Sequence, residues 1–119
     1  MDEIRDAKMV YAAAELTRPM CSPTSDGSAA AIVASEAFVD KHGLGDQAVE
    51  IIGQSMVTDM RSTFDDKSAQ SLVGKEISRE AARQVYQQAG ITPDDVSVIE
   101  LHDCFSANEL ITYEALGLC

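Results

Sequence analysis

Three short apolar runs alternate along this chain with segments of helical spacing. The runs are SAAAIVAS at residues 28–35, AVEIIGQSMV at residues 48–57 and VSVIEL at residues 96–101. The first and third are apolar on both faces, which is typical of a strand buried between two layers. The second is rich in β-branched residues, which favour strands. We therefore predict three strands with helices between them, an order that indicates a layered α/β fold.

Local capping residues define the helices between these runs. Ser35 is a predicted N-cap, and Gly43 a predicted stop, because Ser accepts a backbone N–H and Gly tolerates positive φ. Apolar residues spaced about four apart predict an amphipathic helix over residues 72–89. Gly74 is a candidate break in this helix, and Ser78 is a candidate N-cap for the part that follows. Two further signals are a stop at Gly90 and a one-turn cap at residues 92–95.

Composition agrees with one foldable unit and argues against several partner classes. Apolar residues make up 45% and charged residues 24%, close to the averages for globular proteins. The formal net charge of -11 argues against a nucleic-acid or anionic-membrane surface, because phosphates attract clusters of Lys and Arg. No apolar run is long enough to span a bilayer, and the N-terminal residues lack the apolar core of a signal peptide. We therefore expect a soluble cytoplasmic protein. The alanine-rich residues 2–14 also predict a weak helix.

The last stretch, VIELHDCFSANELITYEALGLC, places polar residues between a predicted strand and a helix. Ser106 and Glu109 match an S-x-x-E capping box, while Phe105 and Leu110 occupy the positions of a hydrophobic staple. These features predict a well-defined helix over residues 107–116. Because open α/β sheets bind ligands beyond the carboxyl ends of their strands, the residues just before this helix are candidates for function.

His102, Asp103 and Cys104 fill this junction. A neutral imidazole at His102 could donate an N–H to a carbonyl oxygen that becomes anionic during acyl transfer, and the alternative is a core histidine bonded to backbone. Asp103 could orient the loop, although a structural helix cap is favoured. Cys104 could be a thiolate beside a helix N-terminus or a small buried hydrophobe. No metal site is expected, since adjacent residues leaving a strand diverge and no second ligand pair is found.

Three stretches together resemble thiolases of the sterol-carrier-protein type: CSPTSDGSAAAIVASEAF, GKEISREAARQVYQQAGITPDDVSVIEL and HDCFSANELITYEALGLC. The HDCF signature is fairly specific, since ordinary thiolases have Asn-Glu-Ala-Phe at that place. The resemblance implies a thiolase-like α-β-α-β-α layered fold built from two similar halves. Residues 1–46 would end the N-terminal half and residues 47–119 would begin the C-terminal half, so that the chain would be a fragment.

The resemblance also implies the chemistry. In that family a nucleophilic cysteine takes the acyl group of a 3-ketoacyl-CoA, and coenzyme A, a co-substrate rather than a bound cofactor, accepts it. His102 matches the histidine that helps to bind the thioester oxygen, and Cys104 matches a cysteine that faces the catalytic cavity.

The same resemblance implies that the nucleophile lies outside this chain, that the fragment is inactive alone, and that the parent protein is a homodimer, peroxisomal if eukaryotic. Two alternatives remain open at this point. One is a non-thiolytic lipid-transfer or scaffold protein of the same fold, and the other is an aldolase-type subunit in steroid side-chain degradation.

Overall fold

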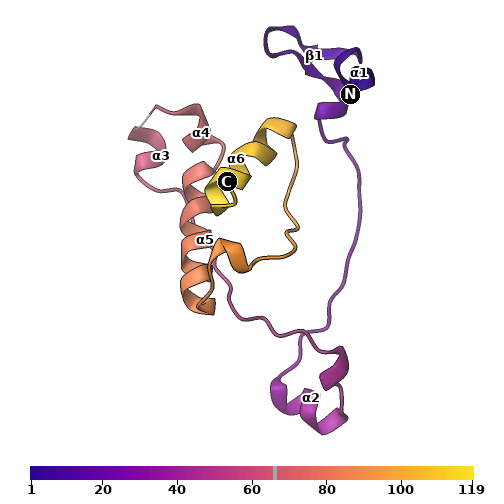
Figure 1. The fold of residues 1–119 in the computed structure, drawn as a ribbon, viewed down its shortest axis with the longest axis vertical. Coiled ribbons are helices and arrows are strands. Elements are labelled where there is room, and N and C mark those ends of the chain that lie inside the picture. The colour runs from indigo at the N-terminus through magenta and orange to yellow at the C-terminus, as the bar shows by residue number, and fades with distance from the viewer. Residues whose placement is uncertain (66) are drawn as a thin grey trace.

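The chain forms three parts joined by open connecting segments, and two of them meet where residues 19–23 lie against residues 103–106 (Figure 1). The computed structural model describes residues 1–65 and 67–119. A hairpin unit of residues 1–20 lies at one end, α2 (Glu36–His42) lies at the other, and the remaining helices form a body between them. The radius of gyration is 18.7 Å, whereas a compact domain of this length would have about 13.5 Å. The described residues are therefore spread out around open connecting segments.

The body is built on two helices that cross each other. In Figure 1, α5 (Lys75–Ala89) packs against α6 (Ser106–Leu116). At this contact the small side chains of Ala82 and Ala115 are 7% and 4% exposed, and they are the buried apolar residues of the described part. Small residues let the two helix backbones approach closely, but they bury little apolar area. The body's core is consequently small.

The helices that precede α5 are short and are separated from it by a glycine. Gly74 has φ 98° and interrupts the helix as predicted, because a left-handed residue cannot continue an α-helix. Ser78 lies inside α5, so its prediction as an N-cap is wrong. Ser68 caps the preceding helix instead, since its hydroxyl accepts the Ser71 N–H at 3.4 Å. The remaining elements of the body are α3 (Ser62–Asp65), α4 (Ala69–Leu72) and η4 (Pro93–Asp95).

Several caps lie where the sequence predicts them. The Ser35 hydroxyl accepts the Phe38 N–H at 3.3 Å, and Gly43 ends α2 with φ 63°. Thr92 and Asp95 form a reciprocal capping box around η4. In the same way Gly90 ends α5 with φ 67° and Gly117 ends α6 with φ 75°. A further turn, η3 (Gly45–Gln47), follows α2.

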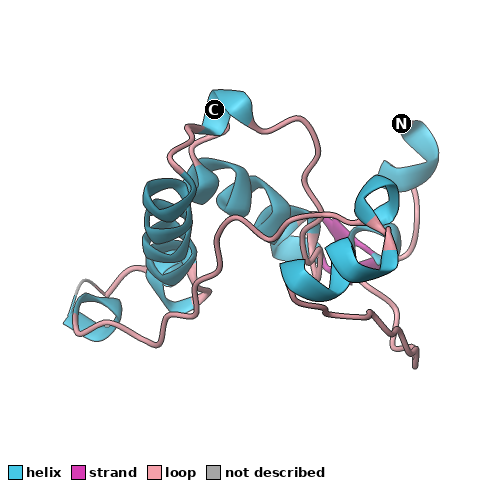
Figure 2. Ribbon diagram, turned by 90° about the horizontal axis from the view of Figure 1, so that it is seen from below, coloured by secondary structure: helices cyan, strands magenta, loops and turns pink. Residues whose placement is uncertain are grey.

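The N-terminal residues form one short helix and then a small antiparallel hairpin, so the helix predicted over residues 2–14 is confirmed over Asp2–Arg5 and wrong beyond it. Figure 2 shows this two-stranded sheet in magenta. The chain reverses at Glu15, which has φ 50°, and Thr17 is fully buried with its hydroxyl donating to the Ile4 carbonyl at 2.8 Å. A left-handed residue and a buried side-chain bond override the helix propensity of the alanines. The elements are α1 (Asp2–Arg5), β1 (Met9–Tyr11), η1 (Ala12–Ala14), β2 (Leu16–Thr17) and η2 (Arg18–Met20).

The three predicted strands at residues 28–35, 48–57 and 96–101 are wrong as strands. Within the described ranges these segments pair with no other strand. The two strands that the structure does contain there, β1 and β2, both belong to the N-terminal hairpin. Most of the apolar side chains of the three segments face solvent, with Ile32 97% and Val98 78% exposed. A strand that is apolar on both faces needs a neighbour along each edge and a layer on each face, and none of the described residues supplies them.

One of these segments contacts α5 instead of another strand. The Gln54 N–H donates to the Gln88 side-chain oxygen at 3.1 Å, and the Ser55 hydroxyl donates to Gln84 Oε1 at 2.6 Å. Gly53 lies so close to α5 that an added Cβ would meet the Val85 carbonyl oxygen at 3.2 Å. Residues 53–55 are thus held against the helix by side-chain amides. The chain combines helices with a small sheet, and none of the helices in its described part is long and apolar enough to cross a membrane.

Candidate functional site

The predicted junction lies at the start of α6, although no strand precedes it. The helix predicted over residues 107–116 is confirmed and begins one residue earlier, at Ser106. His102 and Asp103 are exposed, while Cys104 is half-buried. The alternative of a buried core histidine therefore does not hold. An exposed imidazole at this position can reach a ligand.

A second segment, far away in sequence, lies against this junction. Cys21 forms an antiparallel bridge with Phe105, and the Ser22 N–H donates to the Cys104 carbonyl at 2.9 Å. Neighbouring residues of an extended pair point to opposite faces, so Cys21 and Cys104 lie on opposite sides of this contact. All three cysteines of the chain are free thiols. Sequence reasoning missed this pairing, because nothing local in either segment specifies its partner.

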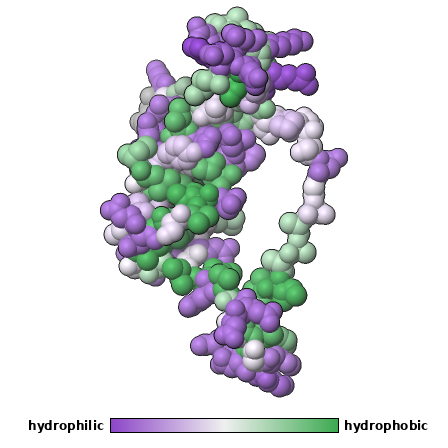
Figure 3. All heavy atoms as spheres, turned by 45° about the vertical axis from the view of Figure 1, so that its right-hand side comes forward, coloured by the Kyte–Doolittle hydropathy of each residue, from purple (hydrophilic) through white to green (hydrophobic). Residues whose placement is uncertain are grey.

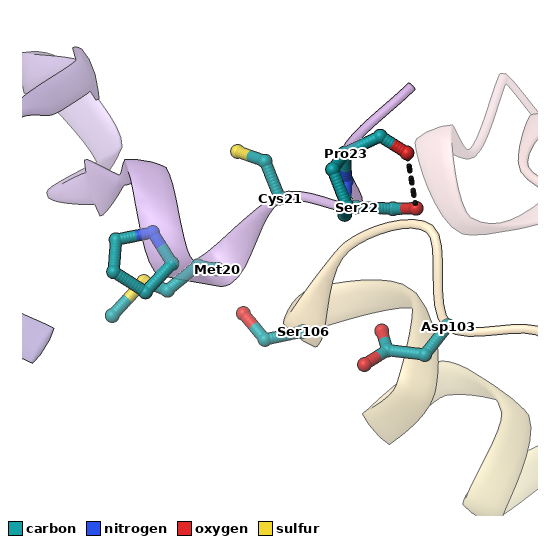
Figure 4. A pocket seen from close by; sticks show the side chains of 7 residues that line it. Met20, Cys21, Ser22, Pro23, Asp103 and Ser106 are labelled. Carbon is teal, nitrogen blue, oxygen red and sulfur yellow. Dashed lines mark hydrogen bonds between the residues drawn. The ribbon is translucent and has the colours of Figure 1, made fainter. Parts of the chain in front are cut away.

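The two segments enclose a partly open cavity of about 240 Å³. Figure 4 shows Pro23 and Ser22 on one side and Ser106 and Asp103, at the start of α6, on the other. The Cys21 side chain points away from Asp103, and its thiol contacts the Thr17 carbonyl at 3.6 Å. The complete lining is Pro19, Met20, Cys21, Ser22, Pro23, Asp103 and Ser106.

The start of α6 is not capped in the way the sequence predicts. Phe105 occupies the N-cap position and makes no side-chain cap bond, so the capping box of Ser106 and Glu109 is wrong. Because the helix begins one residue early, Ser106 has helical geometry and cannot act as the N-cap. Glu109 instead accepts a hydrogen bond from the Tyr113 hydroxyl, one turn further along. The hydrophobic staple is also wrong, since Phe105 and Leu110 are 46% and 65% exposed.

Negative charge gathers along this end of α6. The hydrogen bond to Glu109 raises the pKa of the Tyr113 phenol, and burial and the charges of Glu109 and Asp103 raise it further. The phenol therefore stays protonated and can donate throughout the neutral range.

In the described part of the chain, no group of three or more His, Cys, Asp and Glu side chains could hold a metal ion.

Comparison with known proteins identifies the family of this region. Residues 57–119, more than half of the chain, match the family described as thiolase C-terminal domain-like. The match covers the whole junction, α5 and α6.

Three relatives align over the full length of the chain. It is 60% identical to sterol carrier protein 2 of Rattus norvegicus and spans 21% of that protein. It is 47% identical to non-specific lipid-transfer protein-like 2 of Caenorhabditis elegans and spans 29% of it. It is 35% identical to benzoylsuccinyl-CoA thiolase subunit BbsB of Thauera aromatica, again spanning 29%. The chain thus spans between a fifth and a third of the length of these relatives.

Proposed function

This chain belongs to the thiolase C-terminal domain-like family, and on that premise we propose that it forms part of an acyltransferase that acts on acyl-CoA. The family match confirms the resemblance that the HDCF motif indicated. In the proposed reaction, a cysteine thiolate attacks the 3-keto carbon of a 3-ketoacyl-CoA, the C2–C3 bond breaks, and the C2 carbanion takes a proton and leaves as a short acyl-CoA. The thiol of coenzyme A then takes the acyl group from the cysteine and frees its thiol again. That nucleophile belongs to a longer parent protein and lies outside this chain. The parent protein is proposed to be a homodimer.

His102 has the central role in this proposal. When a thiolate attacks a carbonyl or thioester carbon, the oxygen becomes negatively charged, and a positioned N–H donor stabilises it. The single observation that supports this role is the exposed imidazole just before α6, inside the family match and next in sequence to Asp103, which lines the cavity. Removal of one such donor costs about two to three powers of ten in kcat.

Cys104 is proposed to face the substrate rather than to attack it. It is half-buried, and its carbonyl is held by Ser22, so its backbone is fixed at the junction. A weak S–H donor or acceptor in this place would contact the acyl group. Coenzyme A would enter as co-substrate, with no resident cofactor.

The test is 3-ketoacyl-CoA thiolysis by the parent protein and its His102→Ala variant. We expect a fall in kcat of about 100- to 1000-fold for the variant. His42→Ala is the matched control, because this second histidine lies at the end of α2 and contacts the Phe38 ring, with centroids 4.3 Å apart. No thiolysis by the parent on any chain length would reject the proposed activity, and an unimpaired His102→Ala variant would reject the role of His102.

A second candidate function is lipid transfer without thiolysis. Two relatives are named for carrying sterol or transferring lipid, and both align over this whole chain. The measurement is movement of a fluorescent sterol between donor and acceptor vesicles, made on the parent protein. Transfer that persists in a parent lacking all thiolysis would favour this candidate over the first.

A further inference from the structure

The first turn of α6 needs support that its own cap does not give. Four N–H groups at the start of any α-helix lack partners within the helix, and a side-chain cap normally satisfies one or two of them. In α6 the N-cap residue, Phe105, makes no side-chain cap bond. This uncapped turn directly follows His102–Cys104, so any fraying of it would move the junction.

A series of hydrogen bonds connects Tyr113 to this junction. The Tyr113 hydroxyl donates to the Glu109 carboxylate, and the Glu109 N–H donates to the Phe105 carbonyl at 3.2 Å. On the other side, the Ser22 N–H donates to the Cys104 carbonyl at 2.9 Å. The backbone on both sides of the Cys104–Phe105 peptide is therefore anchored, once by the cavity wall and once by the helix.

We propose that Tyr113 is a positioning residue that fixes the first turn of α6 through Glu109 and thereby holds His102 in place. The catalytic part of this inference rests on the proposed function, whereas the positional part does not. A bond between side chains four apart spans one helical turn, so it ties the uncapped turn to the firmly packed part of the helix. Ala115, two residues beyond Tyr113, is buried against α5.

The hydrogen bond between Tyr113 and Glu109 is suited to hold the helix end at all times. Both side chains are half-buried, which limits competition from water. A phenol keeps its proton at neutral pH, and the hydrogen bond to Glu109 raises the pKa of Tyr113 further from that range. Hydrogen bonds to a charged acceptor are the stronger kind, which fits a contact that has to restrain a helix end.

The chain provides a matched control at the other end of the same helix. Tyr86 is also half-buried, and its hydroxyl donates to the Leu116 carbonyl at 2.9 Å. Tyr86→Phe removes one hydroxyl and one hydrogen bond, as Tyr113→Phe does. It does so at the C-terminus of α6, away from His102.

The first experiment measures backbone hydrogen exchange in the parent protein over residues 104–110. We expect Tyr113→Phe to speed exchange there by about fivefold or more, as for loss of one hydrogen bond to a charged group, and Tyr86→Phe to leave it unchanged. Equal exchange in the wild type and Tyr113→Phe would overturn the inference. This readout needs no enzymatic activity, so it still decides the positional part if the parent proves inactive.

The second experiment measures thiolysis by the same variants. Tyr113→Phe should lower kcat about tenfold and change KM by less than about twofold, because a misplaced donor mainly affects the transition state. Glu109→Gln keeps an oxygen that can accept from Tyr113 and should recover most of the activity that Glu109→Leu loses. An active parent whose kcat is unchanged in Tyr113→Phe would reject the catalytic part while leaving thiolysis itself intact.

Discussion

Gly117 combines two constraints that a side chain would violate. It ends α6 with φ 75°, and an added Cβ would meet Pro93 Cγ at 3.2 Å. A left-handed backbone disfavours any Cβ, and the proline ring is too rigid to move aside easily. The position therefore demands glycine both for its conformation and for its contact with η4.

We expect Gly117→Ala to lower the free energy of unfolding of the parent protein by about 1–2 kcal/mol. The measurement is urea unfolding followed by circular dichroism. The control is Gly45→Ala, since Gly45 has no atom near its Cβ direction and no positive φ. If Gly117→Ala lowers the free energy of unfolding no more than Gly45→Ala does, the steric argument is contradicted.

Local signals explain which residues the sequence could predict. Ser35 with Phe38, and Thr92 with Asp95, lie three positions apart, so a short stretch of sequence contains both partners of each cap. Ser106 shows the limit, because a shift of one residue in the helix start removes its capping role. For the candidate site, position and resemblance could single out His102–Cys104 as candidates. The Ser22 contact that anchors them could not, since it joins segments far apart in the chain.

At the scale of elements, an ion pair links α5 to α6. Lys75 Nζ lies 2.6 Å from Glu114 Oε2, and the Lys75 side chain is only 15% exposed. The Lys75 hydrogen bond and charge lower the pKa of the Glu114 carboxyl from its ordinary 4.5. The folded state thus favours the ionised carboxylate, and this contribution is present above pH 4.5 and lost as the pH falls through the lowered pKa.

We expect Lys75→Met to lower the Tm of the parent protein at pH 7, and the difference from wild type to shrink on acidification, once Glu114 is protonated. Differential scanning calorimetry at a series of pH values measures both effects. Arg5→Met is the control, because the Arg5–Asp2 pair is 71% and 81% exposed and should contribute little. A Tm difference that stays constant down to strongly acidic pH would show that the charge of Glu114 does not matter.

The predicted strands show why elements are harder to predict than caps. Residues 28–35 have the composition of a buried strand, but a strand exists only when another segment pairs with it. The family match supports the α/β class, and the described residues supply no partner for this segment. Residues 53–55 make the same point, because they bond to amide side chains of α5 in place of a neighbouring strand. Periodicity thus indicates burial, while pairing depends on the rest of the fold.

At the scale of the whole molecule, much apolar surface remains open. Figure 3 shows hydrophobic residues reaching the surface over the body and along part of the segment leading to α2. Ile32, Val33 and Val49 are 97%, 82% and 91% exposed, and they lie in extended segments whose backbone groups have no ladder partners in the described ranges. Exposed apolar strands with free edges are templates for association.

We therefore expect the isolated 119-residue chain to self-associate, and the parent protein to do so much less. Ile32→Lys should reduce association of the isolated chain, because a charge within an edge opposes strand pairing. Leu110→Lys is the control, since Leu110 is 65% exposed but lies on the helical surface of α6, where it offers no free edge. Sedimentation velocity over a range of concentrations separates the outcomes. If both substitutions reduce association equally, exposed apolar area alone drives it. If Ile32→Lys reduces association more than Leu110→Lys does, association depends on the unpaired segment of residues 28–35.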